Sequence, residues 1–169
     1  DTRPGRTPDP AIVFLAALSQ TTPAHARGVM SGMRPDDFDD WRARHVFNAL
    51  AAVLDGADGD AGPGPLLALV LDELMSSGHL DESVPTGAAM RRYVSALPTV
   101  DVRGWDAARL GRMLLHQTYR RRIEVLGELL VDRAPGASLA DLDATIGDGI
   151  AELRTLRSRL DAGASEAAA

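Results

Sequence analysis

Apolar residues recur at intervals of three and four positions along most of the chain, which is the spacing of one face of an α-helix. In the first hundred residues these runs are short, and proline, glycine or clusters of polar residues separate them. They predict five short helices, at 11–19, 23–31, 39–55, 66–76 and 86–96. Thr22 before Pro23 supplies an N-cap and a first-turn proline, and Gly78 follows the fourth helix as a left-handed cap.

The last third of the chain has a different pattern, which predicts two long helices. Residues 105–133 contain no proline and carry leucine and isoleucine at helical spacing. The break at 134–137 reads Ala-Pro-Gly-Ala, and Ser138 with Asp141 three positions later resembles a capping box that starts the next helix. Apolar residues then recur almost as in a coiled-coil seam, at Leu139, Leu142, Ile146, Ile150, Leu153, Leu156 and Leu160.

The predicted fold class is all-α, with a compact helical head followed by a long antiparallel helical hairpin. We expect residues 1–10, which hold three prolines, to form a disordered leader. The head covers 11–104 and the hairpin covers 105–161, and the alanine-rich residues 162–169 form a frayed tail.

Composition agrees with a helical, globular chain. Of the 169 residues 45% are hydrophobic, which excludes disorder throughout the chain. Aromatic residues are only 4%, so the core must be built mainly from aliphatic side chains, and an all-β sandwich is not expected.

Two residue types are absent from the chain, and each absence excludes a kind of chemistry. All 18 basic residues are arginine, so the chain lacks the lysine that phosphate loops, Schiff-base enzymes and protein kinases require. Without cysteine it has no disulfide, thiolate nucleophile or cysteine-bound zinc. We expect no catalytic residue, no cofactor and no metal site.

Charge is distributed unevenly, although the net charge is only −6. Residues 36–82 contain eleven acidic residues and two arginines, whereas residues 103–133 contain seven arginines and four acidic residues. This asymmetry favours contacts between subunits or with a protein partner over the wrapping of nucleic acid.

Two acidic clusters resemble metal-binding motifs. Residues 36–40, Asp-Asp-Phe-Asp-Asp, contain the pattern DDxxD that binds magnesium diphosphate in isoprenoid synthases. The second acidic cluster and the large apolar barrel of those enzymes do not fit here, so we interpret these carboxylates as caps of the third helix. Asp55, Asp58 and Asp60 lack the glycine and the final glutamate of a calcium loop, which favours a solvated loop.

The four histidines, His25, His45, His79 and His116, stand far apart in the sequence and form no pair at helical spacing. We interpret them as exposed residues or as residues satisfied within the fold. No serine lies in a nucleophile elbow, so a hydrolase triad has no support.

The hairpin supplies the candidate functional residues. A hairpin alone buries little surface, so its unused apolar faces are suited to a second hairpin from another chain. The residues predicted to mediate self-association are Ile123, Leu126 and Leu130 on the first helix and Leu142, Ile146, Ile150, Leu153 and Leu156 on the second. The residues predicted to contact nucleic acid or a partner are Arg112, Arg120, Arg121 and Arg122.

The order of these elements resembles the N-terminal domain of the bacterial replicative DNA helicase DnaB. Residues 33–38 are similar to the family's L-S-P-E-D-F, and 44–50 to H-R-x-I-F-x-A-I. The stretch 71–80 is similar to L-x-E-E-L-x-x-x-G-x-L and 91–98 to A-Y-L-x-x-L, while Tyr119-Arg-Arg-Arg-Ile123 lies where the family has paired arginines. The usual opening E-A-E-x-x-V-L-G is replaced by residues 9–15, Asp-Pro-Ala-Ile-Val-Phe-Leu, and its glycine is lost.

The resemblance implies a non-catalytic protein-interaction and oligomerisation module. In this family the domain forms the collar of the helicase ring, its hairpins pair between subunits, and its surface receives primase and helicase loader proteins. The ATPase motor of the family is a separate domain, and a chain without lysine cannot hold a Walker A site. The implied partners are a second copy, in a dimer or a ring, and a primase, loader or helicase protein.

Two other interpretations remain open at this point. The chain could be a small helical nucleic-acid-binding protein that uses the four arginines, or a magnesium enzyme in which Asp36 and Asp40 converge on a deep pocket. The longest strongly apolar stretch, 11–18, is too short to span a membrane, and no secretory signal precedes it. We therefore expect a cytoplasmic protein with no membrane contact.

Overall fold

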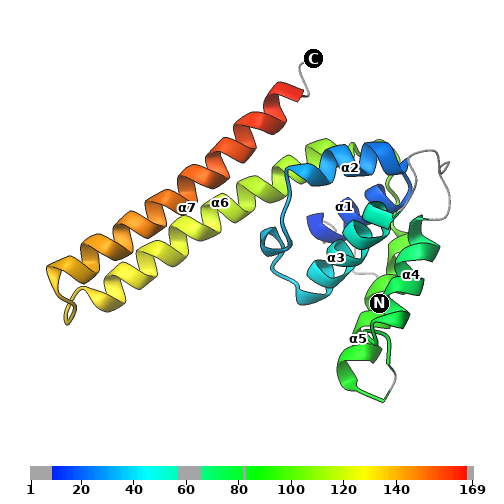
Figure 1. The fold of residues 1–169 in the computed structure, drawn as a ribbon, viewed down its shortest axis with the longest axis horizontal. Helices are drawn as coiled ribbons and strands as arrows, with labels where there is room; N and C mark the ends of the chain where they lie inside the picture. Colours follow the sequence, from blue (N-terminus) through cyan, green and yellow to red (C-terminus); the bar gives the residue numbers. More distant parts are fainter. Residues whose placement is uncertain (1–8, 57–65, 82, 167–169) are drawn as a thin grey trace, which may run out of the picture. The chain divides into compact units, whose positions relative to one another are not determined.

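The computed structural model describes residues 9–56, 66–81 and 83–166, with side chains up to residue 162. Within these ranges the chain forms seven α-helices and two short 3-10 helices and contains no strand (Figure 1). The all-α class is therefore confirmed for the described residues. The leader expected before residue 9, the loop at 57–65 with Asp58 and Asp60, and the end of the tail at 167–169 lie outside them.

The helices lie where the sequence pattern predicts them. Their ends differ from the predicted ends by one or two residues, except at the C-terminus, where the last helix continues to Glu166 through part of the predicted tail. The helices are α1 (Pro10–Ser19), α2 (Pro23–Ser31), α3 (Trp41–Gly56), α4 (Leu66–Ser76), α5 (Pro85–Ala96), α6 (Ala107–Arg133) and α7 (Leu139–Glu166), with 3-10 helices at Pro35–Asp37 and Leu97–Thr99.

Local side-chain chemistry starts several of these helices. Asp9 accepts a hydrogen bond from the amide of Ala11 (3.0 Å) and caps α1. Thr22 caps α2 in the predicted way, because its hydroxyl accepts the amide of His25 (3.3 Å). At α7 the hydroxyl of Ser138 accepts the amide of Asp141 (3.2 Å), which is the first of the two bonds of the predicted capping box. Each bond satisfies one of the backbone donors that a helix start leaves without an intrahelical partner.

The end of α4 adopts the predicted left-handed cap. Gly78 has φ 76°. This conformation is unfavourable for any residue that has a β-carbon, so glycine is favoured here. Its amide donates to the carbonyl of Met75 (3.0 Å), and the amide of His79 donates to that of Leu74 (2.9 Å). These two bonds form a Schellman motif, which turns the chain sharply after α4.

The chain forms two compact units, Asp1–Gly111 and Arg112–Ala169. The sequence predicts the boundary between 104 and 105, but the first turn of α6 belongs to the first unit. Ala107 and Leu110 are buried there, and a β-carbon at Gly111 would lie 3.2 Å from Phe14 Cε2. The division therefore falls inside a continuous helix.

An aromatic cluster lies at the centre of the first unit. The ring centroids of Phe14 and Phe38 are 6.0 Å apart, and those of Phe38 and Phe47 are 5.1 Å apart, in tilted arrangements that aromatic pairs favour. All three side chains are buried, together with aliphatic residues of α1, α3, α4 and α5. The three phenylalanines of the chain thus meet where α1, α3 and the segment between α2 and α3 come together.

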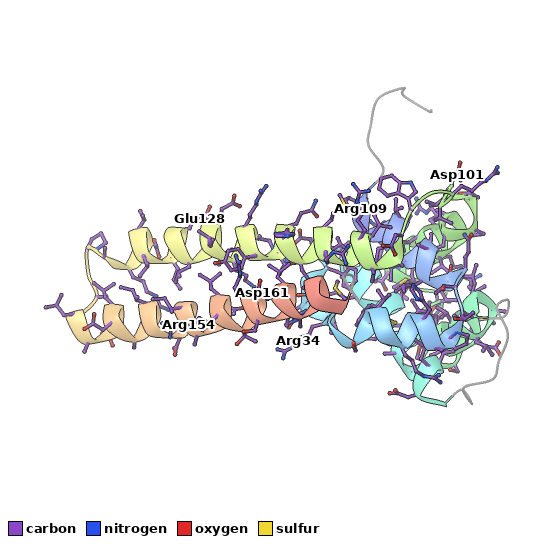
Figure 2. The ribbon with its side chains drawn as sticks, turned by 90° about the horizontal axis from the view of Figure 1, so that it is seen from above. Arg34, Asp101, Arg109, Glu128, Arg154 and Asp161 are labelled. Atoms are coloured by element: carbon purple, nitrogen blue, oxygen red, sulfur yellow. The ribbon has the colours of Figure 1, made fainter. Side chains whose placement is uncertain are left out.

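In the second unit α6 and α7 run antiparallel beside one another (Figures 1 and 2). The two helices pack closely at Gly149 of α7, where an added β-carbon would lie 2.6 Å from both methyl groups of Leu126 on α6. Polar contacts lie on either side of this point along the pair. Arg122 Nε lies 3.0 Å from Glu152 Oε1, and Arg133 Nη1 donates to Thr145 Oγ1 (3.1 Å).

Candidate interaction surfaces

The eight residues predicted to mediate self-association have three different degrees of exposure in the second unit. Leu156 is 4% exposed and belongs to the interior of the chain itself. Four leucines are half-buried, namely Leu126, Leu130, Leu142 and Leu153. The three isoleucines are open to solvent, with Ile123 46%, Ile146 38% and Ile150 39% exposed.

The three isoleucines lie on one side of the helix pair. At 100° per residue, Ile123 and Leu130 lie on one flank of Leu126, the α6 residue that faces α7. Ile146 and Ile150 lie on the corresponding flank of Gly149. Two right-handed helices that run antiparallel present corresponding flanks to the same side, so these residues form one apolar stripe.

The close packing of Leu126 with Gly149 sets the register of this stripe. In this register Ile123 lies at the same height along the helix pair as Leu153, and Leu130 lies at the same height as Ile146. We call Ile123, Leu130, Ile146, Ile150 and Leu153 the hairpin stripe. Large aliphatic side chains that remain exposed in a row indicate a surface that another apolar surface can cover.

Sequence reasoning missed two exposed residues on the opposite flank of α6, Val125 and Leu129. Their spacing of four residues is visible in the sequence, but they lie outside the predicted apolar row of α6, which is Ile123, Leu126 and Leu130. Glu152 on α7 lies on this flank, where it pairs with Arg122. This side of the second unit therefore carries both apolar and charged side chains, whereas the residues of the hairpin stripe are apolar on both helices.

The four candidate arginines do not act as one cluster. Consecutive residues of a helix point about 100° apart, so residues 120, 121 and 122 face three directions. Arg122 pairs with Glu152 within the chain (3.0 Å). Arg112 and Arg121 are half-buried and also engaged with other groups, while Arg120 is exposed.

The acidic cluster before α3 acts locally, as the sequence predicts. Asp40 caps α3, because its carboxylate accepts the amide of Arg42 (2.9 Å) as well as the guanidinium of the same residue. The side-chain hydrogen bond from Arg42 lowers the pKa of Asp40 despite partial burial. The carboxylate of Asp37 is buried and accepts the amide of Arg34 (2.7 Å).

A buried tyrosine lies beside this cap. The guanidinium of Arg42 lies 5.0 Å from the ring centroid of Tyr93, within the range of a cation–π contact. Burial, followed by the nearby Asp40, raises the pKa of Tyr93. Among the residues that the structure describes, its hydroxyl has no hydrogen-bond partner, so the aromatic ring contributes more than the hydroxyl to packing here.

Two of the four histidines meet in the fold, although their positions in the sequence gave no indication of it. The ring centroids of His45 on α3 and His79 after α4 are 4.1 Å apart. Trp41 packs edge-on against His45, with centroids 5.7 Å apart. Burial, and secondly the charge that His79 can carry, lower the pKa of His45.

Among residues 9–56, 66–81 and 83–166 no three histidine, aspartate or glutamate side chains come together in a way that could hold a metal ion. None of the helices in these ranges combines the length and apolar character needed to cross a bilayer. Comparison of the chain with protein-family models, curated proteins and solved structures finds no match.

Proposed function

We propose that the chain is a non-catalytic interaction and oligomerisation module of the kind found at the N-terminus of DnaB-type replicative helicases. In this proposal the head and the hairpin form the arrangement predicted from the sequence, and the hairpins of two copies pair. The observation that carries the proposal is the hairpin stripe, in which three isoleucines remain between 38% and 46% exposed.

Pairing through the stripe follows from the hydrophobic effect. Burial of apolar surface contributes about 25 cal/mol per Å², and two stripes placed face to face would turn two half-open helix pairs into a four-helix bundle. Leu126 and Leu142 are already half-buried within one chain, so the exposed isoleucines would supply most of the new contact. The bundle could close as a dimer or repeat around a ring.

The further partners in this proposal come from the sequence resemblance. They are a primase, a helicase loader or another helicase subunit, and the setting is DNA replication in the cytoplasm. The internal pairing of Arg122 with Glu152 supports a protein-contact role for α6 over a role in binding phosphates.

Solution mass measured by light scattering tests the proposal directly. We expect an oligomer whose mass changes little between low and high salt, because apolar contacts hold it together. Ile150→Asp and Ile146→Asp should each lower the mass towards that of the monomer. Val125→Asp is the matched control, because Val125 is exposed on the opposite flank of α6.

Three outcomes would contradict the proposal. One is a mass that neither stripe variant changes while both keep the helical content of the wild type. Another is an oligomer that Val125→Asp dissociates as readily as Ile150→Asp. A monomer that gains mass when a short DNA duplex is added at low salt would instead support nucleic-acid binding through the arginines of α6.

A further inference from the structure

A second apolar surface lies in the first unit, on the outward side of α4. This helix reads Leu-Leu-Ala-Leu-Val-Leu-Asp-Glu-Leu-Met-Ser, and its many apolar residues extend beyond the face that packs on the core. Leu66, Val70 and Leu74 face the core and are buried, whereas Leu69, Leu71 and Met75 are exposed. Met75 is the most open of these, at 65%.

Hollows flank this outward side of α4 on both edges. One of about 380 Å³ lies between α4 and α5 and is lined mainly by apolar side chains, including Leu71, Met75, Leu80 and Val94. The other, of about 730 Å³, lies between α3 and α4 and is lined by Val53, Leu69, Met75 and neighbouring residues. Met75 therefore stands on a ridge between two hollows that can receive apolar side chains.

Acidic side chains border the hollow between α3 and α4. Asp72 and Glu73 line it directly, and Asp55 lies exposed near the end of α3. Among the described residues that line the other hollow, Arg91 alone is charged, and its guanidinium donates to the carbonyl oxygen of Leu80. Acidic side chains thus outnumber basic ones along this surface. Positive charge on a binding partner would therefore strengthen its binding to this surface.

We propose that this α4 surface binds an amphipathic helix of a partner protein that carries lysine or arginine on its polar side. Apolar side chains of that helix would enter the hollows on either side of Met75, and its basic residues would lie against Asp72 and Glu73. Helices commonly bind grooves in this way, through apolar anchors at helical spacing, and exposed methionine adapts to side chains of different shape.

Charge also disfavours a second copy of the chain that would bind this surface through its own α4 surface. Two α4 surfaces placed together would bring Asp72 and Glu73 of one copy near those of the other. The α4 surface and the hairpin stripe lie in different units, so this inference does not depend on the proposed self-association.

Fluorescence anisotropy with two synthetic helical peptides tests the inference on the full chain. Both peptides carry leucine at helical spacing, one with lysine and the other with glutamate at the remaining positions. We expect the chain to prefer the lysine peptide, and Met75→Asp to weaken this binding about tenfold. Asp72→Lys combined with Glu73→Lys should reverse the preference towards the glutamate peptide.

Two control variants separate a defined surface from general attraction between opposite charges. Glu124→Lys with Glu128→Lys makes the same change of charge on α6, where Glu128 projects on the side away from α7 (Figure 2). Leu139→Asp makes an apolar-to-acidic change at an exposed position of α7. Neither control should change the peptide preference by more than about twofold.

The inference is overturned if the chain does not distinguish the two peptides, or if Met75→Asp binds the lysine peptide as the wild type does. It is also overturned if Glu124→Lys with Glu128→Lys reverses the preference equally well. A fall in solution mass of Met75→Asp would assign the surface to a second copy. A Met75→Asp variant that loses peptide binding but keeps the wild-type mass supports the partner helix, whatever the outcome for the hairpin stripe.

Discussion

The imidazole rings of His45 and His79 lie against one another with their centroids 4.1 Å apart. His45 belongs to the second turn of α3, whereas the Schellman turn after α4 holds the backbone of His79. The contact therefore joins α3 to the end of α4, and two protonated rings at this distance would repel each other.

This contact predicts that stability falls as the solution becomes acidic. Burial and His79 hold the pKa of His45 below its ordinary value of 6.5. The unfolded state therefore takes up a proton first as the pH falls, and it binds more protons than the folded state in that range. The stabilising effect of neutral His45 is complete above pH 6.5 and is lost as the pH falls from 6.5 towards the folded pKa.

Thermal unfolding of variants at pH 7.5 and 5.5 measures this effect. We expect the fall in Tm between the two values to be smaller in His79→Gln, which removes the charge beside His45, and in His45→Gln, which removes the titrating ring. His25→Gln is the control, since His25 is exposed on α2. Equal falls in Tm for all three variants would contradict the prediction.

Gly87 predicts a severe effect of adding one methyl group. A β-carbon at this position would lie 1.8 Å from the carbonyl oxygen of Asp81 and 2.6 Å from its carbonyl carbon. Because both are backbone atoms, Gly87→Ala would have to displace the turn between α4 and α5, at a cost of about 3 kcal/mol in the free energy of unfolding.

Gly28→Ala in α2 is the control. The added methyl group meets nothing within 4 Å, so this change should raise the free energy of unfolding by about 0.5 to 1 kcal/mol. Urea unfolding that shows similar effects for both variants would disagree with this packing.

Two glycines of α7 form a matched pair for testing the packing of the second unit. A β-carbon at Gly147 meets nothing within 4 Å, whereas one at Gly149 would lie 2.6 Å from both methyl groups of Leu126. Gly147→Ala should therefore gain about 0.5 to 1 kcal/mol from helix propensity. Gly149→Ala should have the same gain in helix propensity but a net destabilising effect, because Leu126 must change its rotamer to make room for the methyl group.

A double variant checks whether Leu126 causes the difference between these glycines. In the Leu126→Ala background the added methyl group has room, so Gly149→Ala should become neutral or stabilising in urea unfolding. An equally unfavourable effect with and without the leucine would show that α6 and α7 do not pack at this point.

Arg27 predicts a stability effect that depends on the shape of its side chain. Its Nε and Nη2 both donate to the carbonyl oxygen of Leu54, at 3.1 and 2.6 Å, near the end of α3. Hydrogen bonds from a charged group contribute about 1.5 to 3 kcal/mol, so Arg27→Ala should destabilise by about 2 kcal/mol. Arg27→Lys should recover only part of this loss, because an ammonium cannot match the two-pronged geometry. Arg109→Ala, at an exposed position of α6, is the control.

Much of the helical structure could be predicted from the sequence because its signals are local. Apolar spacing, together with capping and helix-breaking residues, predicted the seven α-helices found in the described part of the chain. Short polar residues such as Thr22 and Ser138 marked where helices begin. The left-handed cap at Gly78 was also predicted, since it depends on neighbouring residues in the chain. The division between the two units was not, because the packing of Gly111 against Phe14 involves residues far apart in sequence.

For the candidate surfaces too, some features could be predicted from the sequence and others depended on the tertiary structure. The sequence by itself determined that Ile123, Ile146 and Ile150 belong to apolar rows at helical spacing, and that Asp40 stands where α3 needs a cap. Only the tertiary structure decided that Leu156 is interior while these isoleucines stay open, that His45 meets His79, and that α4 exposes Met75 between two hollows. The physical reason is that helix spacing determines which residues share a face, whereas contacts between distant segments determine which faces are covered.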